Sequence, residues 1–263
     1  MKLLTASAAL ALLILGSCST SPLGRNQLIL FPEAEIAQMG VAAFNDIQQQ
    51  TTVSKDARTN GYVRCVAEHI LRAMPGQNPA EWDIKVFDND AANAFALPGR
   101  KIGVYTGLLK VAENQDQLAT VIGHEIAHVT ARHSNERVST TFVAQSGLQL
   151  AQIAAGADTP MKQQLFGLLG VGAQVGVLLP FNRAQEAEAD LVGLEYMARA
   201  GFDPRESVRL WQNMEAQGGE RPPEFLSTHP SSQRRITELN ARMRDYMPLS
   251  NEARSRGRVP DCR

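Results

Sequence analysis

The stretch VIGHEIAHVTARH, from Val121 to His133, holds three of the five histidines in this chain of 263 residues. Apolar residues recur around it with helical spacing, at Leu118, Val121, Ile122 and Ile126. Asn114 is a typical N-cap, and Gln117 three positions later is placed to complete a capping box. The stretch is therefore expected to lie on a helix that begins after Asn114.

Within this helix, HEIAH matches the pattern HExxH. Four residues advance a helix by slightly more than one turn, so His124 and His128 project from the same face. Two imidazole nitrogens placed in this way can take adjacent corners of a zinc tetrahedron. Glu125 is offset by about 100°, so its carboxylate lies beside the metal and can accept a proton from water. The alternative is a surface helix with incidental histidines, and the apolar spacing argues against it.

His133 does not fit the longer pattern HExxHxxGxxH. That pattern needs Gly at position 131 and His at position 134, and the chain has Ala131 and Ser134. We therefore expect His133 to be an exposed histidine at the end of the helix, where a positive charge is favourable.

The third zinc ligand is expected farther along the chain, in FNRAQEAEAD. Glu186 and Asp190 are four residues apart and share a helix face, whereas Glu188 points elsewhere. The first acid can bind zinc, and the second can accept the free N–H of a zinc-bound histidine and fix its tautomer. Such an acidic run is usually a solvated face. The HEIAH motif upstream instead favours Glu186 as a ligand of one zinc ion and Asp190 as the acceptor behind a ligand.

Residues 1–17 have the features of a signal peptide, with a positive start and an apolar run from Leu3 to Leu15. The run ends in small residues before Cys18, which resembles the lipobox of bacterial lipoproteins; an ordinary secretory signal is the alternative. Ser19 after the cysteine implies sorting to the outer membrane. Residues 18–30 are then a lipidated tether that anchors the protein without spanning the bilayer. The expected location is the periplasmic face of the outer membrane.

Two further cysteines, Cys65 and Cys262, lie near the two ends of the mature chain. In an oxidising compartment, an even remaining pair predicts a disulfide. Two buried free thiols are the alternative.

Residues 31–263 are predicted to form one domain that is mostly α-helical with one small β-sheet. Apolar spacing predicts helices from Pro32 to Ile47, from Gly61 to Met74, from Ala184 to Arg199, after Pro204 and after Pro230. Alternation predicts a strand from Trp82 to Phe87 and two strands within Asn93 to Leu109, joined around Pro98 and Gly99. Val138 to Pro180 is rich in Ala, Gly, Gln and aliphatic residues, and we expect a buried or lid-forming helical hairpin there rather than a membrane span.

Three stretches, HEIAHVTARH, QEAEADLVGLEYMARAGFDP and FLSTHPSSQRRI, closely resemble the HExxH zinc metallopeptidases that include the CAAX prenyl protease, the mitochondrial inner-membrane stress protease and the bacterial proteins BepA and LoiP. The resemblance covers nearly the whole mature chain. It implies a gluzincin-like domain whose active-site helix packs against a small sheet, with His124, His128 and Glu186 as ligands and Glu125 as base. The short outer-membrane lipoproteins of the family are the nearer comparison, because the repeats of BepA and the spanning helices of the prenyl protease have no counterpart here.

The resemblance also places His229, in the stretch FLSTHP, near the metal. Three interpretations compete. His229 is an exposed loop histidine, a donor to the transition-state oxyanion, or a removable fourth zinc ligand that displaces the reactive water. The resemblance to BepA favours the third.

The expected function is that of a zinc endopeptidase that degrades misfolded or misassembled envelope polypeptides, with the outer-membrane protein assembly machinery as a partner. Phe95, Ala96 and Leu97, or the stretch from Ile102 to Tyr105, would offer an edge strand to an extended substrate; ordinary sheet packing accounts for them equally well. The alternative function is a holdase or assembly factor with a structural zinc ion, and Glu125 argues against it because a structural site needs no base. The net charge of −1 gives no reason to expect a nucleic-acid partner.

Overall fold

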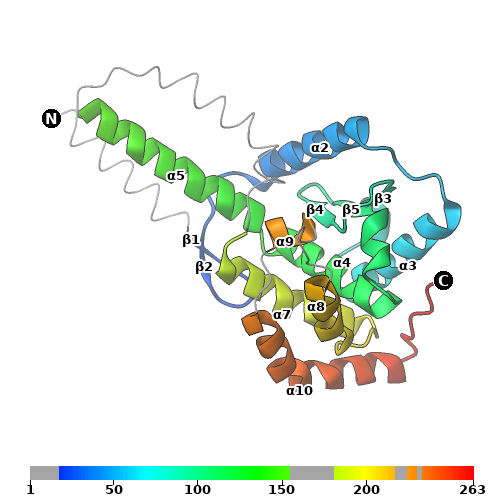
Figure 1. Cartoon of the computed structure of the whole chain (residues 1–263). Helices are drawn as coiled ribbons and strands as arrows, with labels where there is room; N and C mark the ends of the chain where they lie inside the picture. The colour runs from blue at the N-terminus through cyan, green and yellow to red at the C-terminus, as the bar shows by residue number, and fades with distance from the viewer. Residues whose placement is uncertain (1–17, 155–180, 217–223, 230–232) are drawn as a thin grey trace.

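The computed structural model describes residues 18–154, 181–216, 224–229 and 233–263 (Figure 1). The predicted signal peptide, residues 1–17, and positions 155–180 of the predicted hairpin lie outside these ranges. Among the helices described, none combines the length and the apolar character needed to cross a bilayer.

From α2 onward, the described elements follow the predicted order, with helices before and after a short run of strands. In chain order they are β1 (Cys18–Thr20), β2 (Asn26–Leu28), α2 (Glu33–Gln50), α3 (Ala57–Ala73), η1 (Pro79–Glu81), β3 (Asp83–Phe87), β4 (Ala94–Leu97), β5 (Lys101–Tyr105), η2 (Thr106–Lys110), α4 (Gln115–Thr130), α5 (His133–Ala154), α7 (Arg183–Arg199), α8 (Glu206–Ala216), α9 (Glu224–Thr228) and α10 (Gln233–Ser255). The prediction of a mostly helical fold with a small sheet is confirmed.

The three-stranded sheet has the order β3-β5-β4, with β3 and β5 parallel and β4 and β5 antiparallel. Successive side chains of β4 point to opposite faces. Ala94 and Ala96 join the main core with α3 and α4, whereas Phe95 and Leu97 pack against Phe44 of α2. Because β4 is the last strand in the order β3-β5-β4, it is an edge strand, as expected for residues 95–97. The alternative edge strand, from Ile102 onward, is wrong because β5 lies in the middle of the sheet.

Helix α4 lies at the centre of the fold and packs against β4, α3, α7 and α8. The Asn114 side chain accepts hydrogen bonds from the backbone N–H groups of Asp116 and Gln117, which caps the helix as predicted. The predicted capping box is not formed, because the Gln117 side chain accepts from the backbone N–H of Glu113 rather than from that of Asn114. Gly123 and Gly193 lie where α4 and α7 meet. A Cβ atom on Gly193 would lie 2.7 Å from the backbone nitrogen of His124, so glycine is required for the two helix backbones to approach this closely.

The structure differs from the sequence prediction at residues 18–28, which were expected to be a tether. They form an antiparallel β1–β2 hairpin instead. Arg25 binds Glu136 of α5 and Glu188 of α7, and the Gln27 side-chain amide donates to the carbonyl oxygen of Ala131. The hairpin is therefore held against the rest of the fold by buried and partly buried polar contacts, which composition alone does not indicate.

The predicted disulfide between Cys65 and Cys262 is present, with a Cα–Cα distance of 5.7 Å. It joins α3 to the end of the chain across a sequence separation of 197 residues. A crosslink that closes so long a loop stabilises a folded protein by about 2–4 kcal/mol, mainly by restricting the unfolded chain.

Candidate metal centre

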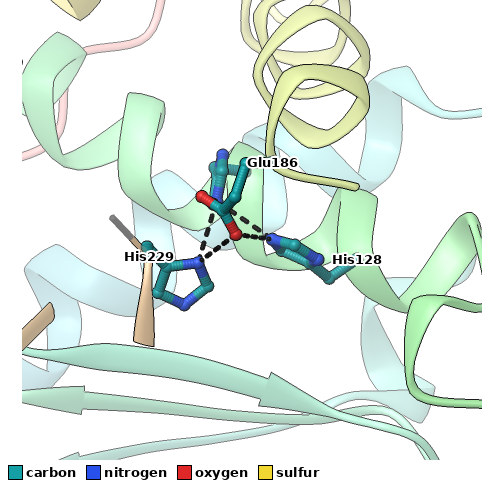
Figure 2. A group of neighbouring side chains, drawn as sticks. His128, Glu186 and His229 are labelled. Carbon is teal, nitrogen blue, oxygen red and sulfur yellow. Dashed lines mark hydrogen bonds and ion pairs between the residues drawn. The ribbon is translucent and has the colours of Figure 1, made fainter. Parts of the chain in front are cut away.

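Four side chains from three separate parts of the chain converge beside α4. His124 and His128 come from α4, Glu186 from the first turn of α7, and His229 directly follows α9. Figure 2 shows His128, Glu186 and His229 pointing toward one another. All four are buried, and each offers one ligand atom within 4.8 Å of the others. The structure thus brings together the residues that the sequence selected.

The spacing of the four ligand atoms suits zinc. The Nε2 atom of His124 lies 3.0 Å from the Nε2 atom of His128 and 3.2 Å from the Nδ1 atom of His229. The Oε1 atom of Glu186 lies 3.4 Å from the Nε2 atom of His128 and 3.0 Å from the Nδ1 atom of His229. Donors about 2.0–2.1 Å from a tetrahedral zinc ion lie roughly 3.3 Å from one another. Three imidazoles and one carboxylate at these distances therefore fit a zinc ion.

The protonation of two of these groups matches what a metal requires. Burial holds the pKa of His128 well below its usual value, which keeps this imidazole neutral. Burial raises the pKa of Glu186, but the charge of His229 and a hydrogen bond with His128 outweigh burial and hold that pKa well below its usual value. A neutral imidazole and an ionised carboxylate are the forms that bind metal.

Asp190 lies behind His124, where the sequence prediction put it. Its Oδ1 atom is 3.1 Å from the Nδ1 atom of His124, so the Nε2 atom of His124 is left for a metal. Burial alone would lower the pKa of His124, but the hydrogen bond that His124 donates to Asp190 and the charge of Glu186 raise it.

Arg235, on α10, was not predicted from the sequence. Its guanidinium binds Asp190 through two contacts of 2.6 Å and lies 2.7 Å from the Oε2 atom of Glu186. It also stacks over the ring of Trp211 at 4.0 Å. Burial raises the pKa of Asp190, but the charge of Arg235 and its hydrogen bond outweigh burial and lower it. Arg235 therefore holds Asp190 in its ionised form and also contacts Glu186.

Glu125 lies beside the four ligand atoms, with one oxygen toward β4 and the other toward His229. The backbone N–H of Ala96 donates to Oε2 at 3.1 Å, and Oε1 is 3.3 Å from the Nε2 atom of His229. Burial raises the pKa of Glu125 above its usual value, although the nearby charges of His229 and His124 oppose this. A buried carboxylate beside a metal site is placed to accept a proton from water and to return it.

His229 is not the exposed loop histidine that one interpretation allowed, because only 3% of its surface is exposed. The short helix α9, which ends just before His229, was not predicted from the sequence. The His229 ring stacks between Phe225 and Phe181, with ring centroids 4.4 and 5.2 Å away. Phe181 also stacks on His128 at 3.7 Å. These aromatic rings fix the direction in which the His229 nitrogens point.

The prediction that His133 is exposed at a helix end is wrong. Its side chain is fully buried, and its Nδ1 atom lies 2.9 Å from the Nδ1 atom of His128. On one continuous helix, the two histidines would be rotated apart by about 140°. The chain instead turns at Arg132, which adopts φ 55°, and a new helix begins at His133. This reversal directs His133 back toward the metal centre.

Glu188 was expected to point away from the site, and it does point away from the four ligand atoms. It is nevertheless buried, and its Oε2 atom lies 3.1 Å from the Nε2 atom of His133. Arg25 binds the same oxygen, and the backbone N–H of Leu23 donates to Oε1. Glu188 is therefore a buried acid that connects His133 to the N-terminal hairpin.

A cavity of about 410 Å³ opens beside His128, between α2, the turn from β4 to β5 and the start of α5. Its wall carries charges of both signs, on Glu33, Arg100 and Arg132, next to apolar surface from Ile36. Such a cavity next to the candidate metal centre could take a side chain of a bound peptide.

Comparison with known proteins agrees with this site. The family model described as Peptidase family M48 matches residues 57–243. The chain is 37% identical over 206 residues to the mitochondrial metalloendopeptidase OMA1 of Schizosaccharomyces pombe, covering 78% of this chain and 57% of that protein. It is 30% identical over 221 residues to the beta-barrel assembly-enhancing protease of Escherichia coli (BepA), covering 81% of this chain and 44% of that protein.

The human metalloendopeptidase OMA1 is 30% identical over 239 residues, covering 83% of this chain and 43% of that protein. The chain thus spans about half the length of these relatives. The family match covers both candidate ligand helices, α4 and α7, together with His229 and Arg235. The chain therefore belongs to peptidase family M48, whose members are zinc metallopeptidases.

Proposed function

We propose that this protein is a zinc endopeptidase that cleaves unfolded or misassembled polypeptides of the cell envelope. The observation that carries the proposal is Glu125, a buried carboxylate with a raised pKa that lies beside the ligand atoms and is not one of them. Membership of the M48 family and the names of the relatives support the same activity.

The residues of the chain divide the chemistry between them. His124, His128 and Glu186 would hold the zinc ion, which would act as a Lewis acid toward a carbonyl and lower the pKa of water. Glu125 accepts a proton from the attacking water and passes it to the leaving amine. Asp190 keeps His124 in the tautomer whose Nε2 atom is free for the metal.

The edge strand β4 supports an extended polypeptide as the substrate. Ala96 donates its backbone N–H to Glu125, away from β5, so the outer edge of β4 borders the site. A peptide that adds to this edge lies alongside Glu125, and one of its side chains can enter the cavity beside His128. Pairing through the backbone explains how one site can accept many unfolded sequences, because main-chain hydrogen bonds do not depend on the identity of the side chains.

A second candidate function rests on the position of His229. With its Nδ1 atom among the ligand atoms, the donor set is closed, and closed sets are typical of structural zinc sites. A holdase or assembly factor with a structural zinc ion would need such a closed set of ligands and no catalytic base. Glu125 favours the peptidase, since a structural site gains nothing from a buried base at this position.

The decisive experiment is cleavage of casein and of an unfolded porin by the purified protein, before and after removal of metal with a chelator. We expect cleavage that the chelator abolishes and that added zinc restores. Binding of the unfolded porin without any cleavage, with or without zinc, would favour the holdase.

His229→Ala tests whether His229 closes the site. If the closed arrangement is about 90% populated, its removal should raise basal cleavage by about tenfold, because the competent fraction limits activity. The three remaining ligands should keep zinc bound. Basal cleavage of unfolded porin and metal content are measured together on wild type and variant. A large loss of turnover with zinc retained would make His229 an oxyanion donor instead.

The proposed location is the periplasmic face of the outer membrane, through a lipid on Cys18. The supporting observations are the apolar leader with small residues before Cys18 and the similarity to a beta-barrel assembly-enhancing protease, which suggests the outer-membrane protein assembly machinery as a partner. Membrane fractionation of cells that produce wild type or Cys18→Ala tests the anchor, since only the wild type should sediment with outer membranes.

A further inference from the structure

We propose that the N-terminal hairpin positions the metal ligand His128 through a chain of hydrogen bonds from Arg25 by way of Glu188 and His133. This inference rests on the proposed ligand set, because it concerns the far side of one of those ligands. The hairpin, β1 to β2, precedes the residues that the family model matches, 57–243. Arg25 would therefore be a positioning residue that the family match does not include.

The first step is the contact behind His128. The Nε2 atom of His128 faces His124 and Glu186, so its Nδ1 atom is left to face His133, at 2.9 Å. At the other ligand histidine, His124, this place is taken by the carboxylate of Asp190. The two ligand histidines are thus held by different partners, and His128 depends on a second imidazole.

The tautomers follow from this geometry. If Nε2 of His128 binds a metal, its proton must be on Nδ1, where it is donated to Nδ1 of His133. A neutral imidazole has one N–H, so the proton of His133 is then on Nε2, and it points at Glu188 over 3.1 Å. Only this assignment gives one donor and one acceptor to both hydrogen bonds, that between His128 and His133 and that between His133 and Glu188.

The last step is the fixing of Glu188. Arg25 donates to its Oε2 atom through Nε at 3.2 Å and through a terminal nitrogen at 3.1 Å, and the backbone N–H of Leu23 donates to Oε1 at 3.1 Å. Arg25 also donates to both carboxylate oxygens of Glu136. A guanidinium shared by two buried acids has little freedom to move. The direction of the Glu188 carboxylate, and with it that of His133, is set by the hairpin.

The test compares two polar substitutions of one residue. In His133→Asn, the side-chain amide overlaps the place of Nδ1 and can still accept from His128. In His133→Gln, the amide reaches the place of Nε2, contacts Glu188 and leaves His128 without its acceptor. Changing a partner behind a zinc ligand typically lowers metal affinity by about 10–100-fold. We expect that loss for His133→Gln, which leaves His128 without its acceptor. His133→Asn keeps this acceptor but no longer reaches Glu188, so we expect a smaller loss of affinity for it.

Arg25→Met should also lower zinc affinity, as His133→Gln does. Arg199→Met is its matched control. Arg199 is an exposed arginine that pairs with Glu195 at the other end of α7, so its loss should leave metal affinity unchanged. Zinc affinity is measured by competition with a chromogenic chelator, and the visible spectrum of the cobalt-loaded proteins reports the ligand geometry. Circular dichroism of each apoprotein verifies folding.

The outcomes separate this inference from the proposed function. Equal zinc affinity for His133→Asn and His133→Gln would overturn the positioning chain, and so would wild-type affinity and spectrum in Arg25→Met. Absence of metal binding by the wild type would overturn the ligand set and this inference with it. A wild type that binds zinc but cleaves no substrate would contradict the peptidase proposal alone, since the affinity measurements would still decide the role of His133.

Discussion

Replacing Glu125 with Gln should lower kcat/KM for an unfolded substrate by about 10²–10⁴-fold, the usual contribution of a positioned general base. The amide keeps the size of the side chain and its contact with the backbone N–H of Ala96. It has no lone pair basic enough to take a proton from water. The zinc content should stay at about one per chain, because Glu125 lies outside the proposed ligand set.

The measurement pairs turnover with metal content. Porin cleavage and zinc are determined on the same preparation, and Glu113→Gln is the control, an exposed glutamate just before α4. Full activity in Glu125→Gln would remove Glu125 from the mechanism. Loss of zinc together with activity would show instead that Glu125 helps to hold the metal.

The sequence predicted the elements of the fold well because each depends on local chemistry. The side chain of Asn114 caps α4, and apolar residues with helical spacing place the helix in the core. The alternation of β4 sends Ala96 to one face of the sheet and Phe95 to the other. The separation of four residues between His124 and His128 then fixes their common direction, since it depends only on helix geometry.

The sequence failed where one backbone turn decides the outcome. His133 is buried against His128 because Arg132 adopts a left-handed conformation that residues other than glycine seldom adopt. Nothing in the residue types around Arg132 marks this turn, so helical spacing was extended through it. Because position 131 is not glycine, the chain does not match the pattern HExxHxxGxxH. This mismatch gives no information on whether His133 contacts His128 from behind.

The sequence also did not predict which side chains far apart in the chain contact one another. Spacing along α7 shows that Glu188 and Glu186 face different directions, but it does not show what each one meets. Glu188 meets Arg25, which is 163 residues away in the chain. Arg235 reaches Asp190 from α10 in the same way. The charge and position of these arginines in the sequence resemble those of solvated surface residues, so only the fold identifies them as buried partners.

Replacing Glu186 with Gln should lower zinc affinity by more than about 100-fold, beyond the range typical of residues that only support a ligand. The change removes the one negative charge in the candidate ligand set and replaces a strong donor oxygen with a weak amide oxygen. Arg235 would also lose one of its two acidic partners, so the buried guanidinium would be less well compensated.

Two other glutamates of the same helix make this prediction specific. Glu195→Gln, at a partly exposed pair with Arg199, should not change zinc affinity. Glu188→Gln should have an intermediate effect, because Glu188 contacts His133 and not the metal ligands directly. Zinc content after dialysis and zinc affinity by competition are measured for all three variants. If Glu188→Gln lost more zinc than Glu186→Gln, the third ligand would be misassigned. The expected order, Glu186 then Glu188 then Glu195, follows from their contacts: Glu186 lies among the ligand atoms, Glu188 contacts His133, and Glu195 pairs with Arg199.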